Sequence, residues 1–171
     1  ETRKNGITYR GNLARLIEQL INEDQYEKAE EVADLAMEKM PVKHFEYYTL
    51  LEPYISAYYE VEKQDKARNL YLEVAKKYQE NLVYYSGLTL ENQKRYIEEI
   101  FTDIERYRSL VDVLVIYKDT DFALEESKKF NNHLKLFEHF MGSDEPEKET
   151  PIKDQDEAFL DSLIKSINAE N

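Results

Sequence analysis

The chain has 171 residues, 42% hydrophobic and 35% charged, enough to bury the core of one domain or a short repeat array. Four glycines and four prolines supply too few turns for a β-sandwich or barrel, and the absence of cysteine excludes disulfides and thiolate chemistry. The net charge of −13 disfavours nucleic acid or an anionic membrane as the main partner, and the longest apolar run, Val113 to Tyr117, is too short to span a bilayer.

The first third of the chain predicts two helices and a stop. Apolar residues recur at helical spacing up to Ile21, and a polar turn follows at Asp24 and Gln25. A second helix is predicted from Tyr26 to Met40, where Pro41 ends it.

The same periodicity continues through the middle of the chain. Four further helices are predicted over residues 43–61, 64–84, 90–117 and 120–141. Pro53 lies inside the first of these, so we expect a kink there. Asp119 or Thr120 is a suitable N-cap for the last.

The composition changes after residue 141. Residues 142–153 begin a polar, acidic stretch that predicts a linker, and residues 142–171 together carry nine acids and three bases. Residues 154–171 predict a short amphipathic C-terminal helix, because five apolar residues recur there at helical spacing: Phe159, Leu160, Leu163, Ile164 and Ile167. We expect its apolar face to dock on the last helix pair, in the concave groove or on a neighbouring chain.

The helices repeat along the sequence. At one constant offset, the stripe Leu13, Leu16, Ile17, Leu20 falls on Leu51, Tyr54, Ile55, Tyr58. A second, longer offset brings Tyr107, Leu110, Val111, Leu114 and Ala123 into register. The small residues Ala29 and Ala67 fall at the same place after each turn, so we expect them to be buried where paired helices cross. An irregular bundle of six helices with coincidental spacing is the alternative.

The segment NLARLIEQLINEDQYEKAEEVADLAMEKMP, with Ala29, Ala36 and the closing Pro41, resembles tetratricopeptide repeats. The match departs from that motif where Ile17 replaces the glycine of the first helix, and later units lack the closing proline. The resemblance implies an all-α, right-handed solenoid of three antiparallel helix pairs over residues 1–141.

A second resemblance covers LARLIEQLINEDQYEKAEEV, LLEPYISAYYEVEKQDKARNLY and DIERYRSLVDVLVIYKD. These segments look like the soluble C-terminal region of a bacterial multi-span membrane-protein family related to protein O-mannosyltransferases. No signal peptide is visible and the chain begins with Glu1, so we expect a fragment or processed product. The resemblance implies a membrane-associated domain, on the periplasmic rather than the cytoplasmic side.

No pattern of catalytic or metal-ligating residues stands out. His133 and His139 are six residues apart, which is not the spacing of a helical metal pair. The acid pairs Glu30-Glu31, Glu98-Glu99 and Glu125-Glu126 fall on predicted outer helix faces, where we expect solvated charges. We therefore expect no enzymatic activity, metal or cofactor in this domain.

The resemblance to tetratricopeptide repeats assigns the inner groove to the first helix of each pair. The candidate ligand-binding residues on that face are Glu18, Ile21, Glu52, Tyr59 and Arg108. The face is acidic with apolar spots, and its few basic groups disfavour capture of a C-terminal carboxylate. Doubled tyrosines such as Tyr58-Tyr59 can place one ring in the core and the other on this face.

These observations favour a non-enzymatic protein–protein interaction or scaffolding module, with a protein or peptide partner. The membrane portion of its own parent chain is one candidate partner, and self-association through the C-terminal helix is another. Direct membrane insertion and nucleic-acid binding are not expected. The alternatives are a structural cap on a membrane partner and a binder of small molecules or glycans in the tyrosine-rich groove.

Overall fold

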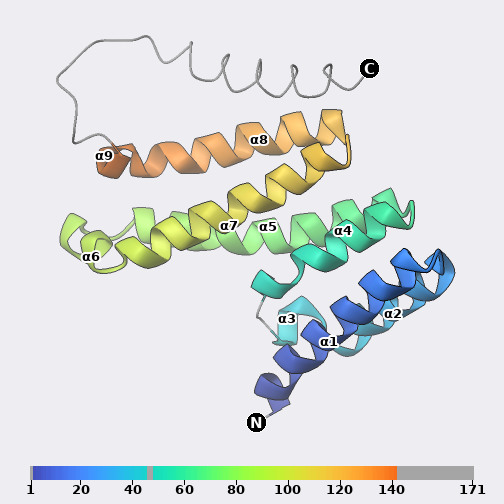
Figure 1. The fold of residues 1–171 in the computed structure, drawn as a ribbon. Coiled ribbons are helices and arrows are strands. Elements are labelled where there is room, and N and C mark those ends of the chain that lie inside the picture. Colours follow the sequence, from blue (N-terminus) through green and yellow to red (C-terminus); the bar gives the residue numbers. More distant parts are fainter. Residues whose placement is uncertain (1, 46–47, 142–171) are drawn as a thin grey trace.

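The computed structural model describes residues 2–45 and 48–141, and this part of the chain is all-helical, with no strand (Figure 1). The long helices are α1 (Thr2–Asn22), α2 (Tyr26–Lys39), α4 (Glu52–Glu60), α5 (Gln64–Ser86), α7 (Ile97–Ile116) and α8 (Thr120–Leu134). The short elements are α3 (Val42–Phe45), α6 (Leu90–Arg95), α9 (Glu138–Met141) and the 3-10 turns η1 (Tyr48–Leu50) and η2 (Lys135–Phe137).

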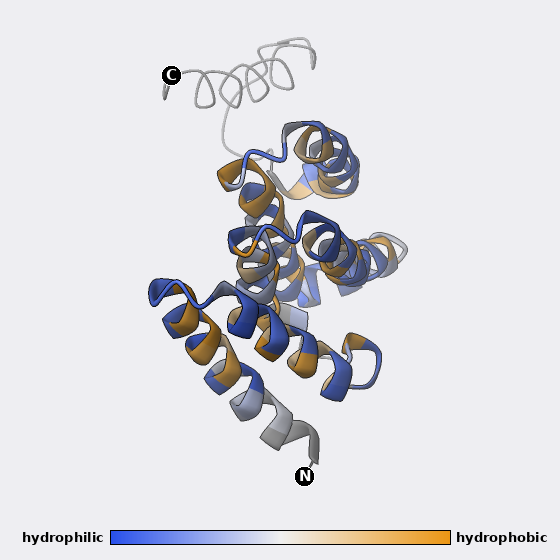
Figure 2. Cartoon of the chain, turned by 90° about the vertical axis from the view of Figure 1, so that its right-hand side faces the viewer, coloured by the Kyte–Doolittle hydropathy of each residue, from blue (hydrophilic) through white to orange (hydrophobic). Residues whose placement is uncertain are grey.

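Consecutive long helices pack against each other: α1 on α2, α4 on α5 and α7 on α8. Next in extent are the contacts of α5 with α7 and of α4 with α1 and α2. Hydrophobic and hydrophilic residues alternate around each helix, as expected for helices with one packed face (Figure 2). The layers therefore follow the chain order, from α1 and α2 at one end to α8 at the other (Figure 1).

Three turns of the same geometry connect the helices of these layers. Each contains one non-glycine residue with positive φ: Asp24 (57°), Glu62 (59°) and Lys118 (58°). After each of them, a backbone N–H donates to the carbonyl five residues earlier: Gln25 to Leu20 at 2.8 Å, Lys63 to Tyr58 at 2.7 Å and Asp119 to Leu114 at 2.9 Å. This Schellman-type closure satisfies carbonyls at each helix end. The three turns fall at the same position in each of the three units predicted from the sequence.

Small side chains lie at the crossing points just beyond these turns. Ala29, Ala67 and Ala123 are 1%, 0% and 0% exposed, so the predicted burial of Ala29 and Ala67 is confirmed. Because alanine has only a methyl group, the two backbones can approach closely at each crossing. The short turns and these alanines together set the spacing within each helix pair.

Aromatic residues fill the core between α5, α7 and α8. Tyr78 contacts Tyr48 edge-on, with ring centroids 4.9 Å apart, and stacks on Tyr107 at 6.2 Å. Tyr107 in turn meets Phe130 edge-on at 5.2 Å. The Tyr107 hydroxyl accepts a hydrogen bond from the Gln79 side chain at 2.7 Å, so this polar group keeps a partner inside the core.

A buried arginine in α1 connects this helix to α2 and α4. Arg10 is 1% exposed and donates from Nη2 to the carbonyl of Met40 at 2.5 Å, at the C-terminal end of α2. The cation there lies at the negative end of the helix dipole. The Tyr54 hydroxyl donates to the backbone carbonyl of Arg10 at 2.7 Å, so α1, α2 and α4 meet at this residue.

The prediction of one kinked helix over residues 43–61 is wrong. The structure has α3, η1 and α4 in this range, and α4 begins at Glu52 with Pro53 in its first turn. A proline lacks the N–H that a helix interior needs, but the first turn has no intrahelical acceptor for that group. Pro53 therefore starts a helix here rather than bending one.

Two other predicted helices are interrupted. The helix predicted over residues 90–117 is divided at Tyr96 into α6 and α7, and Thr89 caps α6 by accepting a hydrogen bond from the Asn92 N–H. The helix predicted over residues 120–141 ends at Leu134 and continues as η2 and α9. Asp119 precedes α8, as predicted for an N-cap, but its carboxylate makes no capping hydrogen bond. The predicted linker at 142–153 and helix at 154–171 lie outside the described residues.

Replacing Ala29 or Ala67 by leucine tests the close helix crossings. A leucine side chain has no space there, so we expect each variant to lose about 1–3 kcal/mol of unfolding free energy in urea denaturation. Glu31→Leu introduces the same side chain at an exposed position of α2 and should change stability little. Equal stability of all three variants and the parent would contradict the assignment of these crossings.

Candidate binding groove

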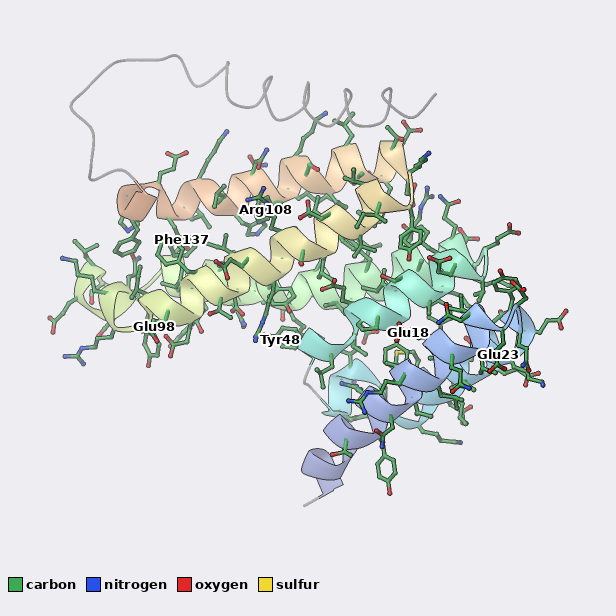
Figure 3. All side chains as sticks on the ribbon, in the orientation of Figure 1. Glu18, Glu23, Tyr48, Glu98, Arg108 and Phe137 are labelled. Carbon is green, nitrogen blue, oxygen red and sulfur yellow. The ribbon has the colours of Figure 1, made fainter. Side chains whose placement is uncertain are left out.

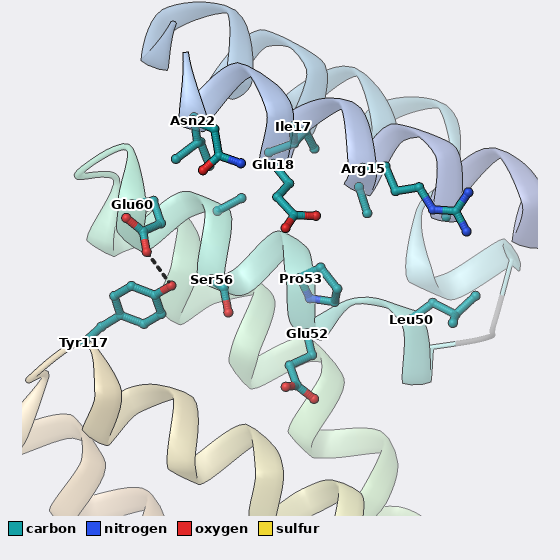
Figure 4. Close-up of a pocket in the computed structure, with 14 residues that line it drawn as sticks. Arg15, Ile17, Glu18, Asn22, Leu50, Glu52, Pro53, Ser56, Glu60 and Tyr117 are labelled. Atoms are coloured by element: carbon teal, nitrogen blue, oxygen red, sulfur yellow. Dashed lines mark hydrogen bonds between the residues drawn. The ribbon is translucent and has the colours of Figure 1, made fainter. Parts of the chain in front are cut away.

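A groove of about 730 Å³ lies between α1 and α4, and Tyr117, just after α7, closes one end (Figure 4). Its apolar lining includes Ala14, Ile17, Ile21, Leu50, Pro53 and Ala57. Its polar lining includes Arg15, Glu18, Asn22, Glu52, Ser56 and Glu60. The groove thus combines an apolar surface with an excess of carboxylates.

The carboxylates of the groove come from both helices. Glu18 projects from α1 toward α4, whereas Arg15 points away from Glu18 (Figure 4). Neither Glu18 nor Glu52 makes an ion pair with another of the described residues. Glu60 accepts a hydrogen bond from the Tyr117 hydroxyl at 2.8 Å. Negative charge at this surface is therefore left for a ligand or solvent to balance.

Glu52 stands in an unfavourable position for an ionised acid. Partial burial raises its pKa, and the nearby carboxylate of Asp112 on α7 raises it further. Burial also raises the pKa of Asp112, although the Arg108 guanidinium opposes that change. The acidic surface thus continues from the groove across α4 to α7, and its charges are partly desolvated at this point.

Tyr117, which closes one end of the groove, is stacked on Tyr59. The rings of Tyr59 and Tyr117 are parallel within 6°, with centroids 5.0 Å apart. Burial and the hydrogen bond to Glu60 raise the pKa of Tyr117 to about 12. Tyr59 donates its own hydroxyl to Asp119 at 2.7 Å. Both hydroxyls are therefore engaged inside the protein, and the rings act as a wall.

Asp119 connects the stacked tyrosines to α5. The carboxylate is 3% exposed and binds Arg68 of α5 through two hydrogen bonds, of 2.5 and 2.7 Å. The Arg68 guanidinium holds the pKa of Asp119 below its usual range, against the opposing effect of burial. Arg68 also lies over the Phe122 ring, 5.2 Å from its centroid. This bidentate pair joins α5 to the start of α8.

The equivalent contact between the first two helix pairs has the opposite polarity. Glu30 of α2 binds Lys63 at 3.1 Å and Lys66 at 2.7 Å. Counted from the positive-φ residue of each turn, Arg68 holds the same position as Glu30, and Asp119 holds the same position as Lys63. The same two positions therefore carry an acid–base pair at one junction and a base–acid pair at the next.

The structure brings together some of the residues predicted from the sequence for the groove. Glu18, Ile21 and Glu52 line it. Tyr59 stacks behind Tyr117 instead of lining the groove. Arg108 lies on α7 beside Asp112, outside the groove lining (Figure 3). Arg108 is separated from Glu18 because α4 lies between α1 and α7.

Tyr117 and Asp119, at the groove end, are not among the residues predicted for the groove. One signal was available for Tyr117, because it ends the apolar run that begins at Val113, where a helix leaves the core. No sequence signal showed that Asp119 would bind Arg68, because 51 residues separate them. That contact depends on the stacking of two helix pairs.

One acid predicted to face solvent is buried. Glu126 is 0% exposed and accepts a hydrogen bond from Lys129 at 2.7 Å, whereas its neighbour Glu125 is exposed. Position 126 lies three residues after Ala123 and four before Phe130, so it shares their packed face of α8. The outer-face assignment was therefore wrong for Glu126. In the part of the chain that is described, no group of three or more His, Asp or Glu side chains could hold a metal ion.

Comparison with known proteins identifies no match. No family model matches the chain, and no curated protein or solved structure matches it either. The resemblances to tetratricopeptide repeats and to a membrane-protein family therefore stay predictions from the sequence. None of the described helices is long and apolar enough to cross a membrane.

The Asp119–Arg68 pair predicts a pH-dependent loss of stability. Because the folded-state pKa of Asp119 is lowered, its contribution is complete above the unfolded-state pKa of about 4 and is lost as the pH falls through the folded value. We expect Asp119→Asn to cost about 1–3 kcal/mol at pH 7, with the difference from the parent shrinking in acid. Urea denaturation across this pH range measures it, with Glu125→Gln, which removes an exposed ion pair, as control. A deficit that did not change with pH would contradict the role of the charge.

Glu52 and Asp112 predict an effect of the opposite sign. Their raised pKa values mean that the folded chain holds these protons more tightly, so ionisation at neutral pH opposes folding. We expect Glu52→Gln and Asp112→Asn each to raise the unfolding free energy at pH 7 by roughly 0.3–1 kcal/mol, a range limited by solvent screening. The gain should vanish near pH 3. Glu18→Gln, at an exposed position of the same groove, serves as the control, and a loss of stability in both test variants would refute the interpretation.

Proposed function

We propose that residues 1–141 form a tetratricopeptide-like array of three stacked helix pairs that acts as a non-enzymatic protein interaction module. This proposal adds a regular stacking of helix pairs to the all-helical fold. Its support is the turn geometry at Asp24, Glu62 and Lys118 and the buried alanine that follows each turn. The two junctions joined by ion pairs at equivalent positions add a second, independent regularity.

The groove between α1 and α4 is the proposed binding surface. One observation is the main support for this function. An apolar surface lies next to two carboxylates, Glu18 and Glu52, that have no ion-pair partner among the described residues. Keeping Glu52 charged in a partly desolvated position costs stability, and a cationic ligand would remove that cost. The arrangement suits a peptide segment that combines an apolar side chain with lysine or arginine.

The volume and position of the groove fit a segment of a protein chain. A volume of about 730 Å³ is in the range of pockets that enclose several side chains. Apolar contact would supply most of the affinity, whereas the carboxylates would select a basic partner and speed its approach. A glycan ligand is less favoured, because Tyr117 is the only tyrosine among the described residues that line the groove and its hydroxyl already binds Glu60.

A peptide-binding experiment tests this function. We expect a short fluorescent peptide of alternating lysine and leucine to bind the parent protein, and a glutamate–leucine peptide of the same length not to bind. Replacing Glu18 and Glu52 together by lysine should weaken binding at least about tenfold, equivalent to roughly 1.4 kcal/mol. Fluorescence anisotropy at fixed salt concentration gives both affinities.

The control separates the groove from the general negative charge of the protein. Glu31→Lys with Glu99→Lys makes the same change in net charge at exposed positions of α2 and α7. We expect this variant to bind the basic peptide with little change. Equal weakening by both double variants would mean that the peptide responds to net charge alone and would refute the groove as the binding site.

A further inference from the structure

Among the described residues, nothing covers one face of α8 in the way that the next helix covers the equivalent faces of α2 and α5. On α2 this face receives α4, and on α5 it receives α7. The main contacts of α8 among the described residues are with α7, α5 and η2, on its other side. Counted from its own turn, Leu124 holds the position from which Arg68 and Glu30 bind the next helix pair.

Two residues of this face are more exposed than their counterparts on α5. On α5, Ala75 and Tyr78 hold this face and are 0% and 2% exposed. Their counterparts on α8, Asn131 and Leu134, are only half-buried, and Leu134 keeps one side packed against the core. Leu124 is also half-buried, and it is not among the apolar residues packed against the core. We call Leu124, Asn131 and Leu134, with the adjacent Lys128, the end face.

We propose that residues 158–167 of the same chain dock on the end face and take the place of a fourth helix pair. Five apolar residues in this segment recur at helical spacing: Phe159, Leu160, Leu163, Ile164 and Ile167. A helix of this length is not stable alone in water, so it needs a surface to cover its apolar side. Stacked arrays in turn need a cover for their last unit. The docking rests on the stacked arrangement proposed above, but not on peptide binding in the groove.

The segment between Met141 and Phe159 is long enough to let residues 158–167 reach the end face. Seventeen residues separate Met141 from Phe159, whereas twelve connect α2 to α4 and ten connect α5 to α7. An extended linker of that size can reach on the order of 50 Å, more than twice the length of α8 at about 1.5 Å per residue. The segment can therefore run antiparallel to α8, as the next helix does at the other two junctions.

The negative charge of the C-terminal segment favours docking on the end face rather than in the groove. Residues 142–171 carry nine acids and three bases, a net charge of −6. The groove presents Glu18, Glu52 and Glu60 and would repel this segment. On the end face, Lys128 is exposed, and Asp156, Glu157 or Asp161 can approach it. The groove then stays open for an external partner.

Amide hydrogen exchange on the complete chain at low concentration tests the docking. We expect residues 158–167 to exchange at least about tenfold more slowly than a random coil. Leu124→Asp should abolish this protection, and Lys128→Glu should reduce it, while α7 keeps its own protection as evidence that the fold is intact. Leu35→Asp makes the same change at an exposed leucine on α2 and should leave the protection of 158–167 unchanged.

Three results would overturn the proposal. Random-coil exchange of residues 158–167 in the parent chain would mean that the segment does not dock. Protection that appears only as protein concentration rises would make a second copy the occupant. Protection that survives Leu124→Asp would place the segment on another surface. None of these results bears on peptide binding in the groove, so the two proposals fail separately.

Discussion

The arrangement of this protein depends on the close approach of two helices joined by a very short turn. A turn of this kind needs one residue with left-handed backbone, which costs a non-glycine residue roughly 1–2 kcal/mol. Asp24, Glu62 and Lys118 all accept that strain. The buried alanine after each turn then lets the helices pack at short range. The strain and the alanine occur together three times, and this is the basis for the proposal that each pair is a unit with an outer face available for the next unit.

The contacts between these units are more varied than the contacts within them. Glu30 binds Lys63 and Lys66 at the first junction, and Arg68 binds Asp119 at the second, with the polarity reversed. A pair of charges requires only complementarity, so the two sides can exchange sign together without changing the geometry. The reversal also disfavours wrong neighbours, because the α2 face would bring Glu30 against Asp119 if the third pair stacked on the first. In the proposed array, these charges therefore favour the same order of pairs as the chain connection does.

The sequence was most informative where the physical cause is local. Helical period and the position of Ala29 predicted the all-helical fold and the buried crossings, because both depend on residues within one helix pair. Predictions failed where two local rules compete: Pro53 can bend a helix or begin one, and the neighbouring packing of Leu51 and Tyr54 favours a beginning. Three of the residues predicted for the groove, Glu18, Ile21 and Glu52, do line it. Its closed end was not predicted, because Tyr117 and Asp119 contact residues that are more than fifty positions away in the sequence.

The groove and the core follow opposite rules for polar groups. In the core, Arg10, Asp119 and Glu126 are buried and each makes at least one hydrogen bond, which offsets part of the cost of burying the charge. In the groove, Glu52 is partly desolvated beside Asp112, and neither acid has an ion-pair partner among the described residues. A chain selected only for stability would place an amide at either position. Retaining an ionised Glu52 at a stability cost is understandable if it meets a cation when a partner binds in the proposed groove, because binding then recovers the electrostatic energy that folding alone does not.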